Sequence, residues 1–84
     1  MTTHEKLKSM LIENGLFENQ AESVMELARP EIDKLFPDYR ITWDRPANEY
    51  PKQMFNIWFV TMRPIAFNWI EKNCPQAWFK SIFA

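Results

Sequence analysis

The chain begins with apolar side chains at the spacing i, i+3, i+4, which is the spacing of one helix face: Leu7, Met10 and Leu11. Thr2 and Glu5 have the spacing of a capping box, in which each side chain bonds an otherwise unpaired backbone N–H. Gly15, the only glycine, suits the left-handed position that ends many helices, and Leu16 would then contact Leu11. The pattern predicts a helix over about residues 3 to 14.

A second helical stripe follows: Ala21, Val24, Met25, Ala28, Ile32, Leu35 and Phe36. Asn19, with Glu22 three residues later, repeats the capping-box spacing and marks the expected start. Pro30 interrupts the stripe, so the helix either kinks there or ends at Ala28 and resumes with Pro30 in its first turn. Because the stripe is unbroken, we expect a kinked helix or two closely abutted helices, ending before Pro37.

Residues 37 to 51 contain three of the six prolines and are expected to form a long connection. Apolar and polar side chains alternate over residues 39 to 43, which is typical of a short strand. The same alternation fits a loop whose side chains are anchored on the helices. Loops of this length in compact domains are often functional or tightly packed.

Residues 51 to 73 are predicted to form the third main helix. Its stripe runs Met54, Trp58, Met62, Ile65, Ala66, Trp69 and Ile70. Pro51 suits the first turn, and Pro64 interrupts the stripe. In the alternative, residues 55 to 62 form a strand paired with residues 39 to 43, because apolar side chains also alternate there.

Pro75 opens a last short helix with four large apolar side chains on one face: Trp78, Phe79, Ile82 and Phe83. The sequence therefore predicts a single domain over residues 1–84 that is mostly α, with three main helices, a short C-terminal helix and a long Pro-rich loop. The alternative is an α+β fold with a two-stranded ribbon at about 39–43 and 55–62.

Composition and charge narrow the classes of function. A chain that is 46% hydrophobic is typical of a folded domain, and a net charge of −1 provides no overall attraction to nucleic acid. The single cysteine, Cys74, cannot form an internal disulfide and fits a reducing cytosol. The polar start, MTTHEKLKSM, lacks the apolar core of a signal peptide, and no stretch suits a membrane span. We therefore expect a cytoplasmic protein.

Catalytic and metal-binding signatures are weak. His4, the only histidine, is expected to face solvent, and Cys74 to be half-buried; together they are too few for a metal site or a nucleophile–base pair. Three carboxylates beside the long loop are expected to stabilise turns: Asp38, Asp44 and Glu49. We expect no cofactor and no enzymatic activity. A pocket lined by Asp44, Arg45 and Trp69 would instead favour a small enzyme or ligand carrier.

Residues 50 to 70 carry more apolar surface than one side of a helix can bury in so short a chain. Aromatic residues and methionine are enriched at the centres of interfaces. The main hypothesis is therefore a small non-enzymatic interaction protein that self-associates, as a homodimer, through aromatic helix faces. The predicted interface has Trp58, Phe59 and Met62 at its centre and Trp78, Phe79 and Phe83 at its edge.

A second hypothesis is a regulator that binds single-stranded nucleic acid. Such proteins stack bases on aromatic side chains between cationic groups. The candidate patch consists of Arg40, Trp43, Arg45 and Arg63. Because the chain is nearly neutral, electrostatic attraction to nucleic acid would be weak.

Two runs, ITWDRPANEYP over residues 41–51 and NCPQAWF over residues 73–79, resemble small uncharacterised proteins encoded by phages and by marine microbial sequence. The resemblance covers residues 41 to 79 and carries no established motif. It implies no activity and transfers no site residue. It implies an accessory protein of unknown function rather than an enzyme.

Overall fold

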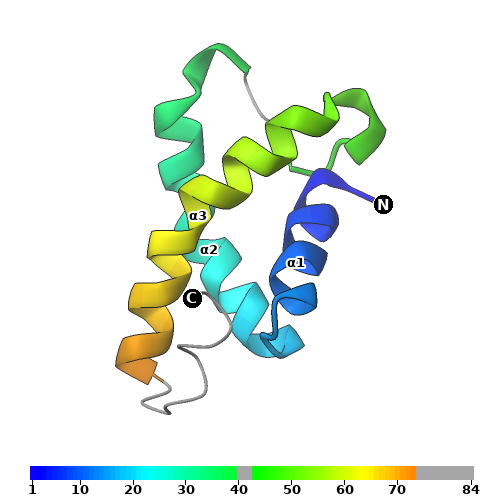
Figure 1. The fold of residues 1–84 in the computed structure, drawn as a ribbon. Coiled ribbons are helices and arrows are strands. Elements are labelled where there is room, and N and C mark those ends of the chain that lie inside the picture. Colours follow the sequence, from blue (N-terminus) through cyan, green and yellow to red (C-terminus); the bar gives the residue numbers. More distant parts are fainter. Residues whose placement is uncertain (40–42, 74–84) are drawn as a thin grey trace.

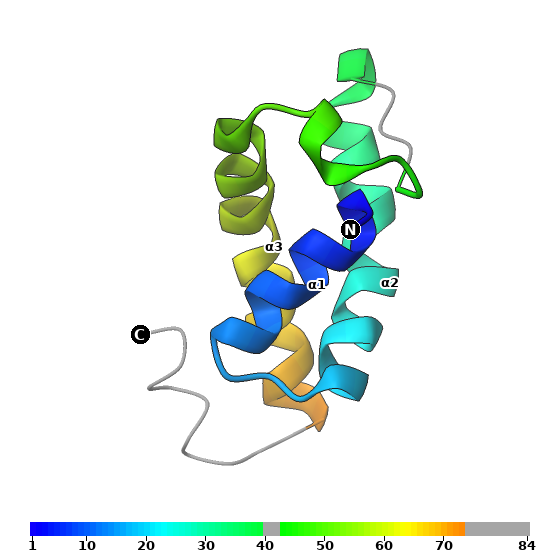
Figure 2. The ribbon, with the colours of Figure 1, turned by 90° about the vertical axis from the view of Figure 1, so that its right-hand side faces the viewer.

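Three α-helices dominate the computed structural model, which describes residues 1–39 and 43–73 (Figure 1). These are α1 (Thr3–Glu13), α2 (Glu18–Leu35) and α3 (Lys52–Asn73), with short 3-10 turns η1 (Pro37–Tyr39) and η2 (Ala47–Glu49) between α2 and α3. Figure 2 shows α1 lying across the pair formed by α2 and α3. The prediction of a mostly α fold is confirmed. The predicted C-terminal helix lies outside the described residues.

The alternative ribbon is wrong, because residues 55 to 62 lie within α3. Phe55, Trp58 and Met62 are buried together on one helix face. Ile57, which a strand would place on the same face as Phe55, is 45% exposed. Burial therefore follows the helical period and not the alternation of a strand.

Both ends of α1 form as predicted. The Glu5 N–H donates to Thr2 Oγ1 at 3.1 Å, and the Thr2 N–H donates to Glu5 Oε1 at 3.0 Å. At the other end Gly15 has φ 111°, and the N–H of Leu16 donates to the carbonyl of Leu11 at 3.2 Å. The second bond of a Schellman ending joins the Gly15 N–H to the Ile12 carbonyl at 3.0 Å.

The start of α2 differs from the prediction. The helix begins at Glu18, and the N–H of Phe17 is bonded by the Gln20 side chain at 2.9 Å. The predicted cap of Asn19 with Glu22 is wrong, because Glu22 bonds to side chains of α1 instead. Leu35 was also expected in the buried stripe but is 60% exposed, because the last turn of α2 extends past α3 (Figure 1).

The two internal prolines do not end their helices: α2 continues through Pro30 and α3 through Pro64. Each proline leaves the carbonyl four residues earlier without its N–H partner. Those carbonyls belong to Glu26 and Val60, which are exposed, as are both prolines. Water can therefore bond the two carbonyls, which limits the cost of each interruption.

The core is filled by one face of each helix together with three residues from the connections. It consists of Leu7, Leu11, Leu16, Ala21, Val24, Met25, Ala28, Ile32, Trp43, Ala47, Met54, Phe55, Trp58, Met62, Ala66 and Ile70. Trp58 lies at its centre. Its ring meets those of Tyr50 and Phe55 edge-on, each at 5.3 Å between centroids, and that of Trp43 at 6.5 Å. Edge-to-face pairs of this kind add to the stabilisation from burial alone.

The segment from residue 43 to 47 is bonded to the start of the chain. The N–H groups of Thr3 and His4 donate to the carbonyls of Arg45 and Trp43, at 2.8 and 3.0 Å. The Ala47 N–H donates to the Met1 carbonyl at 2.9 Å. The Thr3 hydroxyl, which is fully buried, also donates to the Arg45 carbonyl, at 2.9 Å. The first N–H groups of α1, which no helix can satisfy internally, thus find their acceptors in the loop.

We predict that Gly15→Ala lowers the free energy of unfolding by about 1 to 2 kcal/mol, because a Cβ atom clashes with the backbone at positive φ. Urea denaturation followed by circular dichroism measures the change. Glu13→Ala, an exposed site nearby, is the control and should change the free energy by less than about 0.5 kcal/mol. An unchanged midpoint for Gly15→Ala would show that the left-handed ending is not needed.

Candidate functional surface

The predicted centre of the interface lies inside the protein. Trp58 and Met62 are both 0% exposed, so their role as contact residues for a partner is wrong. They are buried because that face of α3 packs against α1 and α2. Phe59 is half-buried at the edge of the core. The predicted edge residues, Trp78, Phe79 and Phe83, lie outside the described residues.

The opposite face of α3 carries a second row of apolar residues, which we call the outer stripe: Ile57, Val60, Pro64 and Phe67. Val60 is 61% exposed and Ile57 is 45% exposed, while Phe67 is half-buried. Val60, Pro64 and Phe67 line a shallow hollow of about 320 Å³ together with Arg63. A helix of a single small domain normally has one apolar face, so this second row is unusual.

The outer stripe could have been found in the sequence. Its residues are spaced by three, four and three positions, which is as helical as the spacing of the buried stripe. The sequence therefore contains two apolar stripes on one helix. The sequence does not reveal which of them faces inward, and the structure buries the stripe that contains Trp58.

The predicted nucleic-acid patch is not assembled as a stacking surface. Trp43 is only 5% exposed, with the Arg29 guanidinium 5.4 Å from its ring centroid and Trp58 packed on it. A base cannot stack on a ring that is enclosed in this way, so the role given to Trp43 is wrong. Arg45 is paired with Glu49 at 3.7 Å, and its guanidinium lies 5.8 Å from the Tyr50 ring centroid.

The two remaining arginines of that patch do not restore it. Arg63 lies on α3 beside the outer stripe, where it lines the hollow with Val60 and Pro64. Arg40 lies outside the described residues. The four residues grouped by the sequence therefore have no common stacking surface in the part of the chain that the structure describes.

His4 does not face solvent as expected; its side chain is 17% exposed. Its Nε2 lies 3.0 and 3.3 Å from the two Glu22 oxygens, and since an ionised carboxylate only accepts, the ring donates from Nε2. Lys8 Nζ lies 2.9 Å from Glu22 Oε2 and 3.4 Å from Glu18 Oε1. The cluster thus ties α1 to the start of α2.

These contacts shift the pKa values of Glu22 and Lys8. The hydrogen bonds from Lys8 and then from His4 lower the pKa of the Glu22 carboxyl. The bond to Glu22 raises the pKa of the Lys8 ammonium. Each charged group therefore favours the charged form of its partner. This arrangement holds two helices together and leaves neither group poised for proton transfer near neutral pH.

The residues that would have favoured a small enzyme do not form one pocket. Trp69 lines a hollow of about 320 Å³ between α2 and α3, with Leu27, Glu31, Ile65, Asn68 and Lys72. Asp44 and Arg45 do not line it. Glu49 is paired with Arg45, and both Asp38 and Asp44 are exposed beside turns, which agrees with the role of turn residues.

The described ranges, 1–39 and 43–73, contain no group of three or more histidine, cysteine, aspartate or glutamate side chains that could hold a metal ion. None of their helices has the length and apolar character needed to cross a bilayer. Comparison of the chain with models of protein families, with curated proteins and with solved structures found no match.

The stability that Glu22 provides should depend on pH. Its pKa in the folded protein is below the ordinary value of 4.5, so the stabilisation is fully present above pH 4.5 and is lost as the pH falls through the lowered value. Glu22→Gln should therefore be less stable than the native protein at about pH 6, and the gap should narrow towards about pH 3.

Urea denaturation at several pH values measures this gap. Glu26→Gln serves as the charge-matched control, because it removes an exposed carboxylate of the same helix outside the cluster. Parallel curves for Glu22→Gln and the native protein over the whole acid range would contradict the prediction.

Proposed function

We propose that the protein is a small non-enzymatic interaction protein that forms a homodimer through the outer stripe of α3. The observation that supports this is the exposure of Ile57 and Val60, 45% and 61%, on a helix whose other face is already buried among the described residues. Contiguous apolar surface on a small protein commonly marks a binding site. The sequence predicted an interface centred on the Trp58 face of α3, and the proposal places it on the opposite face of the same helix.

The spacing of the stripe favours a second copy as the partner. Positions 57, 60, 64 and 67 have the intervals three, four and three, which read the same in both directions. When two α3 helices pack antiparallel about a twofold axis, Ile57 of one copy lies opposite Phe67 of the other, and Val60 lies opposite Pro64. A twofold interface requires such a self-complementary surface.

Charge is compatible with the same arrangement. The stripe itself contains no ionisable group, and its neighbour Arg63 would lie opposite Thr61 of the second copy. In a parallel pair, by contrast, Arg63 would lie beside Arg63, and like charges repel. The antiparallel arrangement is therefore the one that we propose. With a single cysteine and no need for a disulfide, we place this dimer in a reducing cytoplasm.

We predict that the native protein has twice the 10.1 kDa mass of one chain in solution, and that Val60→Ser weakens the dimer by roughly tenfold or more. Each dimer loses two buried valines in this variant. Light scattering behind a sizing column, at two concentrations, measures the mass. Leu35→Ser is the matched control, because Leu35 and Val60 are 60% and 61% exposed but lie on different helices. A native protein that is monomeric at both concentrations would refute the proposal.

A charge pair tests the antiparallel register. Ile57→Lys and Phe67→Glu should each weaken the dimer, and the double variant should recover it, because each lysine then lies opposite a glutamate of the other copy. Within one chain the two positions are about 15 Å apart along the helix, too far for an internal pair. Circular dichroism checks that each variant is folded. A double variant that does not dimerise although its helices remain intact would exclude this register.

A further inference from the structure

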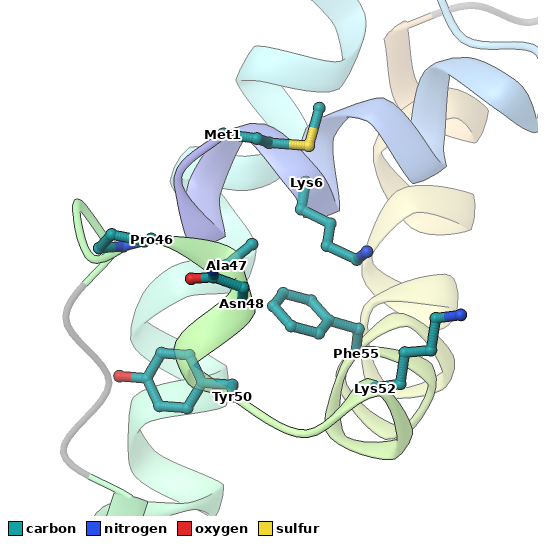
Figure 3. A pocket seen from close by; sticks show the side chains of 8 residues that line it. All are labelled: Met1, Lys6, Pro46, Ala47, Asn48, Tyr50, Lys52 and Phe55. Atoms are coloured by element: carbon teal, nitrogen blue, oxygen red, sulfur yellow. The ribbon is translucent and has the colours of Figure 1, made fainter.

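Two hollows beside α3 differ in how much of their apolar lining a binding group can reach. One, of about 470 Å³, lies where the start of α1, the turn η2 and the first turn of α3 meet (Figure 3). Phe55 in its lining is only 2% exposed, and the Lys6 ammonium lies 5.2 Å from the centroid of that ring. A binding group therefore cannot stack on Phe55, just as a base cannot stack on Trp43.

The other hollow, of about 320 Å³, lies between α2 and α3 and leaves apolar side chains accessible. Leu27 on α2 is 51% exposed, and Ile65 and Trp69 on α3 are half-buried. A concave apolar surface between two helices suits the apolar face of a further helix. We call this surface the α2–α3 groove, and it is lined by Leu27, Glu31, Ile65, Asn68, Trp69 and Lys72.

The described part of the chain ends beside this groove. Helix α3 ends at Asn73, directly after a residue of the groove lining. Residues 74 to 84 follow, and Pro75 favours a helix end here, because a proline disfavours helical backbone in the residue before it. Trp78 is five positions beyond Asn73, and five residues span at most about 18 Å. Since Ile65 is about 12 Å from Asn73 along the helix axis, the groove is within reach.

The composition of residues 74 to 84 matches the groove. Four large apolar side chains share one face of the helix that the sequence predicts there: Trp78, Phe79, Ile82 and Phe83. A short helix with such a face is stable in water only when the face is buried. The only basic residue of the segment is Lys80, and Glu31 in the groove lining has no ion-pair partner within residues 1–39 and 43–73.

We propose that residues 74 to 84 bind in the α2–α3 groove of their own chain. The aromatic face of the segment covers Leu27 and Trp69, and Lys80 lies beside Glu31. Binding within one chain is favoured because the covalent connection gives the segment a high effective concentration at the groove. The groove shares no residue with the outer stripe, so the two surfaces can be occupied independently.

A nitroxide label on the segment tests this placement by NMR. In the full chain with Cys74→Ser and Ser81→Cys, the label lies on the polar face of the predicted helix. We expect the ¹⁵N-labelled amides of Leu27 and Glu31 to lose most of their signal intensity and to regain it when ascorbate reduces the nitroxide. An undiminished signal on α2, or a loss that is strongest at the outer stripe, would overturn the proposal.

A mixed sample shows whether the segment binds its own chain. Here the ¹⁵N-labelled chain has no nitroxide, and an unlabelled chain carries it. We expect the Leu27 signal to keep its intensity in this sample, because the nitroxide lies in the groove of the other chain. A loss at Leu27 as large as in the first sample would show that the segment occupies the groove of a second copy, which would refute binding within one chain.

Substitutions on both sides of the contact identify the residues that hold the segment. Leu27→Ser in the groove and Trp78→Ser in the segment should each restore most of the Glu31 signal in the nitroxide-labelled chain. Leu35→Ser, at a residue that is 60% exposed on the same helix but outside the groove, and Gln76→Ser are the controls and should keep the loss. The remaining amide signals show that each variant is folded. Folded Leu27→Ser and Trp78→Ser variants that keep the native loss would contradict the proposal.

Discussion

The fold depends on the hydrogen bonds between the first residues of the chain and residues 43 to 47. Because a helix cannot bond its own first N–H groups, the start of α1 needs acceptors from elsewhere, and the carbonyls of Trp43 and Arg45 supply them. In the same segment Trp43 packs against Trp58, with 6.5 Å between the ring centroids. One short backbone contact therefore joins the start of α1 to the loop that carries Trp43 into the core.

The candidate surface follows from this arrangement. With α1 and α2 packed on the Trp58 face of α3, the exposed apolar residues of the helix lie on the opposite face, where Val60 and Ile57 are 61% and 45% exposed. A protein this small has room for one core only, so its remaining apolar groups lie where another molecule can reach them.

Local patterns in the sequence were sufficient for the helices and for the ends of α1. The Thr2–Glu5 cap and the Gly15 ending need only residues close in the sequence, and both were predicted. Contacts between distant residues were not predicted. Glu22 has the spacing of a cap residue but bonds to His4, and Trp43 has the neighbours of a stacking patch but is buried. Periodicity identifies the faces of a helix, while the choice of the inward face depends on how the other helices pack.

The cap of α1 also has a consequence for synthesis of the protein. The Thr3 hydroxyl and the Arg45 carbonyl that it bonds are 42 positions apart, in a chain of 84 residues. A ribosome makes the chain from its N-terminus, so α1 emerges with its first N–H groups bonded to water. Their acceptors do not exist until the chain has grown by 42 further residues. Helix α1 is thus completed by a segment that is made after it.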